Sequence, residues 1–252
     1  MRKIRLIIAS LLLLAIVVFI DCGKNDKNPA GPEGVEENYI PYNVGNTWTY
    51  QVNPVAEAPF QSTLTVLNKI KENNVEMAVV EERSTKAPED FSLIYYETTA
   101  NSLIMHKIAD FNPGSSDTSV YKFSPPATWL KLPFKKDDTW QVFTYQGNPS
   151  SIPLIGSGLD LDSTYAGVEV KLTLTGKTIG EESIPAAGQE FKAFKVDFNY
   201  SIEINLSGVP VRIPGKLGSF WIVPKVGIVQ IIFYDLYQKP TERRTLISYT
   251  VN

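Results

Sequence analysis

Residues 194–207 read FKVDFNYSIEINLS and alternate apolar and polar side chains at every position. A strand with one buried face and one wetted face has this period of two. Residues 168–175, VEVKLTLT, repeat the alternation, and the stretch between the two segments contains turn-forming residues from 180 to 188. The pattern therefore predicts a long antiparallel hairpin.

Other segments of the chain have strand composition and are separated by short polar turns such as ENN at 72–74. Both faces are mostly apolar in residues 228–237, which predicts a central strand covered on both sides. Residues 151–166 are the best helix candidate, but they contain Pro153, Gly156 and Gly158, and we interpret them as a loop. The further segments predicted as strands are 63–71, 75–84, 91–98, 102–109, 218–223, 227–237 and 244–251.

These segments predict a mainly β fold with little helix. Because open strand edges favour aggregation, we expect a strongly curved antiparallel sheet, either a half-barrel or an open barrel.

Residues 38–252 are long enough for one core. A turn leads into Thr-Trp at both 44–48 and 135–140. The chain therefore forms either a single β domain or two related halves, at about 38–132 and 133–252.

The first 21 residues have the layout of an export signal. A basic stub, MRKIR, precedes the apolar residues 6–20, a run shorter than the roughly 20 residues that a spanning helix needs. With Cys22 at its end, this leader resembles that of a bacterial lipoprotein precursor, in which a signal peptide is removed and the cysteine carries lipid. Asp21 stands where that family has a small residue, and an uncleaved short anchor is the alternative.

Residues 22–37 read CGKNDKNPAGPEGVEE and have almost no apolar surface to bury. This composition predicts a flexible tether between a lipidated Cys22 and the folded part. Gly23 is not the aspartate that resembles an inner-membrane retention signal. We therefore expect a lipid-anchored protein of the cell envelope, with the outer membrane favoured over the inner membrane.

The charge of the chain argues against binding to nucleic acid. The formal charge is −3, and removal of residues 1–21, which carry a net charge of +2, leaves −5. Binding to a phosphate backbone depends on clustered lysines and arginines. Residues 135–136 and 243–244 are only pairs of basic residues, and we expect them to be solvated turn charges.

The chemistry-bearing residues are too sparse for a recognisable active site. Cys22 and His106 are the only cysteine and histidine, which excludes an internal disulfide and an ordinary zinc site. Nucleophilic catalysis needs a base beside the nucleophile, and no such pair is evident. Neighbouring acids such as Glu81 and Glu82 point to opposite faces of a strand. We expect no catalytic residue, metal or cofactor, with a carboxylate-dependent hydrolase as the remote alternative.

Three motifs resemble an uncharacterised family of bacterial envelope lipoproteins. Residues 39–50, YIPYNVGNTWTY, resemble its opening Gly-Asn-x-Trp-x-Tyr motif. Residues 184–194 resemble its middle hairpin, and residues 220–229, FWIVPKVGIV, resemble its late Trp-x-x-Pro-x-Val-Gly-x-Val signature. The resemblance implies a curved antiparallel sheet similar to the half-barrels of periplasmic lipoprotein carriers. It implies no known reaction.

Aromatic residues are the remaining candidates for a binding site. The hollow of a curved sheet, mostly apolar with a few polar groups, is where small ligands bind. We therefore expect a non-enzymatic, membrane-tethered protein that binds an apolar or amphipathic ligand or an envelope partner protein. The alternative is a structural or surface interaction module with a filled core. Residues that could line the hollow are Tyr95, Tyr96, Trp129, Tyr165, Phe191 and Trp221.

Overall fold

The computed structural model describes residues 39–111, 119–147, 169–206 and 209–252. Every regular element in these ranges is a β-strand, and no helix within them is long and apolar enough to cross a membrane. The mainly β prediction is therefore confirmed. The strands are β1 Thr47–Pro54, β2 Phe60–Glu72, β3 Val75–Ser84, β4 Phe91–Thr98, β5 Ser102–Phe111, β6 Ser119–Lys131, β7 Thr139–Gly147, β8 Val170–Ala186, β9 Gln189–Leu206, β10 Val209–Val223, β11 Gly227–Tyr234 and β12 Pro240–Thr250.

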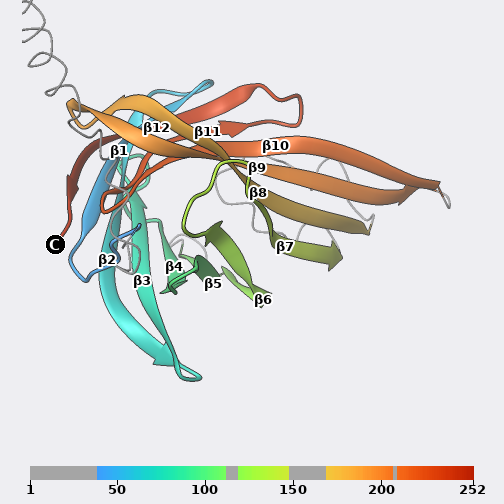
Figure 1. Cartoon of the computed structure of the whole chain (residues 1–252), viewed down its shortest axis with the longest axis horizontal. Coiled ribbons are helices and arrows are strands. Elements are labelled where there is room, and N and C mark those ends of the chain that lie inside the picture. The colour runs from blue at the N-terminus through green and yellow to red at the C-terminus, as the bar shows by residue number, and fades with distance from the viewer. Residues whose placement is uncertain (1–38, 112–118, 148–168, 207–208) are drawn as a thin grey trace, which may run out of the picture. The chain divides into compact units, whose positions relative to one another are not determined.

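The twelve strands form one antiparallel sheet in the order β6-β5-β4-β3-β2-β1-β12-β11-β10-β9-β8-β7. Strands adjacent in sequence are also adjacent in the sheet, with the exception of β6 and β7, and β1 pairs with β12 in the middle (Figure 1). This pairing sets Trp48 opposite Tyr249 and joins the two ends of the folded chain. Strands β6 and β7 are left as the two edges of the sheet.

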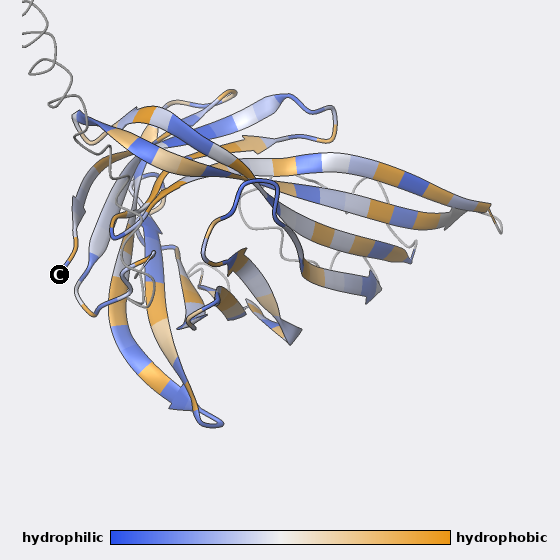
Figure 2. Cartoon of the chain, viewed as in Figure 1, coloured by the Kyte–Doolittle hydropathy of each residue, from blue (hydrophilic) through white to orange (hydrophobic). Residues whose placement is uncertain are grey.

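The sheet is strongly curved (Figure 1), and buried apolar side chains form one core cluster. The apolar–polar alternation predicted for residues 194–207 is present in β9 (Figure 2). Val196, Phe198, Tyr200 and Ile202 are buried, while the polar residues between them are half-buried. Because every second side chain faces inward, burial drives the curvature. Aromatic rings meet inside: Trp129 stacks on Phe198 at 4.4 Å, and Phe220 lies edge-on to both.

The two edge strands approach each other without forming a ladder in the described part of the chain. The indole Nε1 of Trp140 in β7 donates to the Thr128 carbonyl of β6 at 3.0 Å. The rings of Phe123 and Phe143 meet at 5.4 Å across the same seam. Side-chain contacts rather than backbone pairing thus bring the edges of the half-barrel together.

The hairpin predictions are largely confirmed, and the structure extends them. Strands β8 and β9 pair up to Ala186 and Gln189, so residues 180–186 are strand and not the predicted turn. The turn is only Ala187-Gly188, both with positive φ, which suits a two-residue hairpin. Strand β6 was not predicted, because Pro125 and Pro126 interrupt its pattern in an edge strand.

Strand β11 is central, as predicted, but only one of its faces is fully buried. Its other face is half-buried, which corrects the expectation of cover on both sides. Residues Asn38–Asn252 form one compact unit. The predictions for residues 1–21, 22–37 and 151–166 lie outside the described residues.

The turns at 43–46 and 135–138 have the same backbone hydrogen bonds. Gly45 and Asp137 each have positive φ, and each donates its amide to a carbonyl of the second strand after the turn, Val66 in β2 or Thr178 in β8. The next residue in each turn accepts the return bond from the same strand residue. The interpretation as two related halves stays a prediction, and these matching turns are consistent with it.

Candidate functional site

The predicted ligand-binding residues that the structure describes do not converge on one cavity. Tyr95 and Tyr96 follow each other in β4 and therefore face opposite sides of the sheet. Tyr96 is buried and stacks on Tyr42, with ring centroids 5.0 Å apart. Tyr95 lies on the other face under the ammonium group of Lys107, which is 4.1 Å from its ring centroid.

Trp221 and Phe191 also lie apart from the aromatic core around Trp129. The Trp221 indole donates to Glu182 Oε2 at 2.8 Å, and Lys195 lies over its ring at 5.0 Å. Burial acts to raise the pKa of Glu182, but the hydrogen bonds from Trp221 and Lys195 outweigh it and lower the pKa overall. Phe191 meets the ring of Tyr249 at 6.4 Å. Tyr165 and Cys22 lie outside the described residues.

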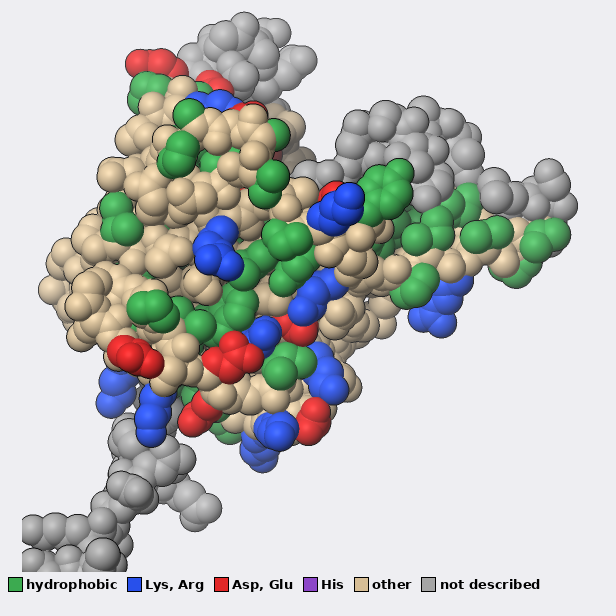
Figure 3. Space-filling view, turned by 90° about the horizontal axis from the view of Figure 1, so that it is seen from above, with side chains coloured by type: hydrophobic (Ala, Val, Ile, Leu, Met, Phe, Trp, Pro, Cys, Tyr) green, Lys and Arg blue, Asp and Glu red, His purple; other side chains and the backbone are tan. Residues whose placement is uncertain are grey.

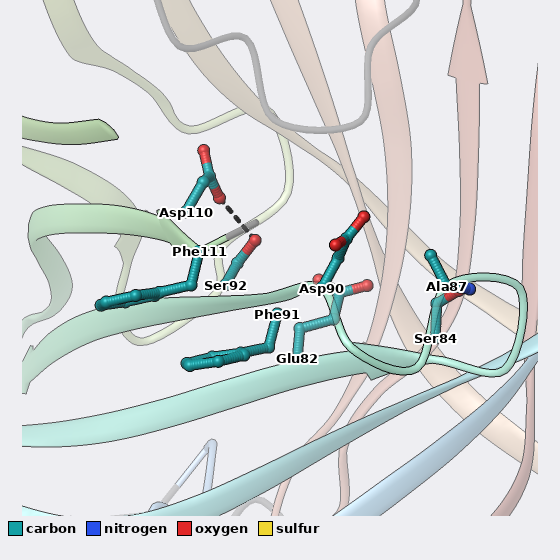
Figure 4. A pocket seen from close by; sticks show the side chains of 8 residues that line it. All are labelled: Glu82, Ser84, Ala87, Asp90, Phe91, Ser92, Asp110 and Phe111. Carbon is teal, nitrogen blue, oxygen red and sulfur yellow. Dashed lines mark hydrogen bonds between the residues drawn. The ribbon is translucent and has the colours of Figure 1, made fainter. Parts of the chain in front are cut away.

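The structure instead has an open groove of about 380 Å³ along β3, β4 and β5, here called the acidic groove (Figure 4). Phe91 and Phe111 stack at 4.6 Å on one face of the sheet, and their rings point away from the side chains of Ser92 and Asp110 (Figure 4). On the opposite face, the Ser92 hydroxyl donates to Asp110 at 2.5 Å. The groove is lined by Glu82, Ser84, Ala87, Asp90, Phe91, Ser92, Asp110 and Phe111.

A charged network closes the inner end of the acidic groove. Glu82 Oε1 accepts hydrogen bonds from Arg244 Nη1 at 2.6 Å and from Ser62 Oγ at 2.7 Å. Arg244 Nε also donates to Glu242 at 2.6 Å. Burial acts to lower the pKa of Arg244, but the two carboxylates outweigh it and raise the pKa. The network connects β12 with β3 across two intervening strands.

Buried tyrosines flank this network. Burial, followed by the charge of Glu82, raises the phenol pKa of Tyr50 and of Tyr96. The Tyr50 hydroxyl donates to the Ile228 carbonyl at 2.8 Å. These phenols therefore stay neutral and act as part of the core.

A second groove, of about 530 Å³, lies between the β8–β9 turn and β12. The Ala187 amide donates to the Leu246 carbonyl at 2.8 Å, which fastens the turn to β12. Gln189 Nε2 lies 3.4 Å from the Tyr249 hydroxyl. This groove contains mostly backbone and small side chains, and its one acidic side chain is Glu190.

The acidic groove can accept hydrogen bonds and positive charge, because carboxylate and hydroxyl oxygens line it. Within the described ranges, no group of three or more histidine, cysteine, aspartate or glutamate residues could hold a metal ion. His106 pairs with Glu97 at 2.8 Å on β5 and does not line the groove.

Sequence analysis did not find the acidic groove, because its residues are distributed over three strands and a loop. The expectation that residues 243–244 are solvated turn charges is wrong in part, because both lie in strand β12: Arg243 is exposed, but most of the Arg244 side chain is withdrawn from solvent. The alternation of side chains along β12 could have shown that Arg244 faces the core, since it shares a strand face with the fully buried Leu246.

Comparisons with known proteins concern the backbone fold alone. No family model matches the sequence, and no curated protein is detectably similar to it. A solved structure of a candidate lipoprotein from Parabacteroides distasonis aligns with 12% identity and a TM-score of 0.45, over 85% of this chain and 99% of that one. A candidate exported protein with a YmcC-like fold from Bacteroides fragilis aligns with 11% identity and a TM-score of 0.43, over 84% of this chain and 98% of that one.

Proposed function

We propose that this chain is a membrane-tethered, non-enzymatic envelope lipoprotein whose folded domain binds a partner protein through an open groove beside its core. One observation carries the choice of a partner over a small apolar ligand. The aromatic side chains expected to line a hollow pack on one another, as in the contact of Trp129 with Phe198 and Phe220. A filled interior leaves the surface as the place for recognition.

The acidic groove is the surface feature best suited to such a contact. Asp90 and Asp110 provide acceptors for a lysine or arginine of a partner. Glu82 is already bonded to Arg244 and Ser62. We therefore expect Asp90 and Asp110 to make the contact.

Mass spectrometry of the full chain, extracted from membranes in mild detergent, tests both for the lipid anchor and for a bound protein or small molecule. We expect an intact mass with lipid on Cys22, and a native spectrum with a bound protein and no small apolar ligand. An N-terminus that begins at unmodified Met1 would contradict the tether. A stoichiometric co-purifying lipid or other apolar molecule would favour the ligand alternative.

Paired substitutions test the acidic groove and the non-enzymatic assignment. Asp90→Asn with Asp110→Asn should release the partner, whereas Glu76→Gln with Glu169→Gln, two exposed acids that do not line the groove, should not. Hydrolysis of a glycoside probe by the wild-type chain, abolished by Asp90→Asn, would overturn the non-enzymatic proposal.

A further inference from the structure

A cluster of lysines surrounds the turn at 135–138, here called the lysine turn. Lys131 pairs with Asp138 and Lys177 pairs with Asp137, each at 3.2 Å. Lys135 and Lys136 are exposed and make no ion pair with any described residue. The turn thus has four lysines and two acids. The ammonium groups of Lys135 and Lys136 have no acidic partner among the described residues.

Backbone hydrogen bonds hold the turn, so the two lysines have a fixed place on the surface of the domain. The Asp137 amide donates to the Thr178 carbonyl at 2.8 Å, and Thr178 returns a bond to Asp138 at 2.9 Å. Phe134, directly before the lysines, is buried and packs on Phe194 at 5.1 Å. The loop is therefore anchored on one side, and its lysines face solvent on the other.

The lysine turn lies where the chain enters the folded domain. Tyr39, the first described residue, is buried and meets the ring of Phe134 edge-on at 5.2 Å. Lys135 and Lys136 follow within two residues, which is at most about 8 Å along the chain. The expected tether, residues 22–37, joins the domain beside this turn.

From this juxtaposition we propose that the lysine turn docks the domain onto an anionic lipid surface. The proposal rests on the membrane tether of the proposed function. The chain after residue 21 has a net charge of −5, so it has no overall attraction to anionic headgroups, and on the face drawn in Figure 3 its lysines and arginines are interspersed with acids. The charges of basic residues beside a lipid anchor act only within about a Debye length of the surface, about 8 Å in physiological salt. The tether and the free lysines together bring this one turn into that range.

The test uses the lipidated full chain in vesicles of phosphatidylcholine, with or without phosphatidylglycerol and with a nitroxide-labelled lipid as quencher. A fluorophore is placed by Thr139→Cys, beside the turn, or by Tyr237→Cys, an exposed site on another turn. We expect stronger quenching at residue 139 on anionic vesicles than on neutral ones, and loss of this excess at high salt. Quenching at residue 237 should not differ between the two vesicles.

Charge reversal identifies the residues responsible. Lys135→Glu with Lys136→Glu should abolish the excess quenching, since each lysine contributes about fivefold to the docking equilibrium. Lys225→Glu with Lys239→Glu makes the same change in charge on two other turns and should retain it. Glutamine in place of glutamate at 135 and 136 should give a smaller loss, and circular dichroism checks the fold.

Equal quenching on both vesicles, or quenching unchanged by the 135/136 reversal, would overturn the proposal. Loss of a bound protein in that variant, with unchanged quenching, would assign the turn to a protein partner instead. Failure of the tether gives a different result, which flotation of the vesicles in a density gradient measures. A chain without a lipid anchor does not float with either kind of vesicle.

Discussion

At the scale of single residues, Asn46 joins the beginning and the end of the folded chain. Its side chain is fully buried, donates to the Pro41 carbonyl at 2.6 Å and accepts from the Asn252 amide at 3.0 Å. The Gly-Asn pair of the opening motif thus has a structural role: Gly45 makes the turn and Asn46 holds the last residue. Sequence analysis recognised the motif, but only the folded chain brings Asn252 to it.

Asn46→Ala should destabilise the domain by about 1–3 kcal/mol, because it leaves the Pro41 carbonyl and the Asn252 amide without partners. Denaturant unfolding measures the change. Asn43→Ala is the matched control, since Asn43 is exposed although it also bonds to Asn252, at 2.5 Å. We expect that control to change stability by less than about 0.5 kcal/mol. Equal effects of the two substitutions would show that burial of Asn46 is not what matters.

We expect the folded domain to lose stability at alkaline pH because of the buried phenol of Tyr96. Burial raises its pKa in the folded state above the ordinary value of about 10. Stability is therefore complete below pH of about 10 and falls as the pH rises above it, because the unfolded chain releases the proton more easily. The melting temperature of Tyr96→Phe should fall less steeply with pH than that of the wild type. A slope identical to that of the exposed control Tyr237→Phe would refute this linkage.

At the scale of elements, the seam between β6 and β7 depends on one tryptophan packed over a glycine. A Cβ at Gly176 would lie 2.3 Å from the Trp140 ring, which donates across the seam to Thr128 at 3.0 Å. Close approach, rather than an unusual backbone conformation, therefore requires glycine at this position. No local sequence pattern indicates this hydrogen bond, since sheet curvature brings the two edges together.

Gly176→Ala should displace the Trp140 ring and cost about 1–3 kcal/mol, as overpacked sites do. Tryptophan fluorescence and denaturant unfolding follow the two effects. The double variant with Trp140→Phe should lose less than the sum of the single variants, because both act on one contact. Additive losses would indicate that the glycine and the ring are independent.

At the scale of the whole molecule, pairing of β1 with β12 and the network around Arg244 unite the first and second halves of the chain. Arg244 binds Glu82 from the first half and Glu242 from its own strand. Its side chain retains only 14% exposure, so the charges are largely withdrawn from water. The curvature of the sheet shortens the distance from β12 to β3 and makes the contact feasible.

Arg244→Met should cost about 3 kcal/mol, because it leaves two partly buried carboxylates without their cation. The neighbouring Arg243→Met provides the control, since Arg243 is exposed on the same strand. Calorimetric melting of both variants makes the comparison. A loss at Arg243 as large as that at Arg244 would contradict the role of the network.

Sequence by itself determined the fold class and most hairpins, because a period of two and short turns are local properties of residues such as those in 194–207. It also led to the predicted leader and tether, which lie outside the described residues. Tertiary structure decided which aromatic side chains fill the core and that Arg244 is buried. It also brought Glu82, Asp90 and Asp110 into one groove and placed the lysine turn beside Tyr39. These features depend on strand pairing and curvature, which bring together residues distant in sequence, and no local pattern records them.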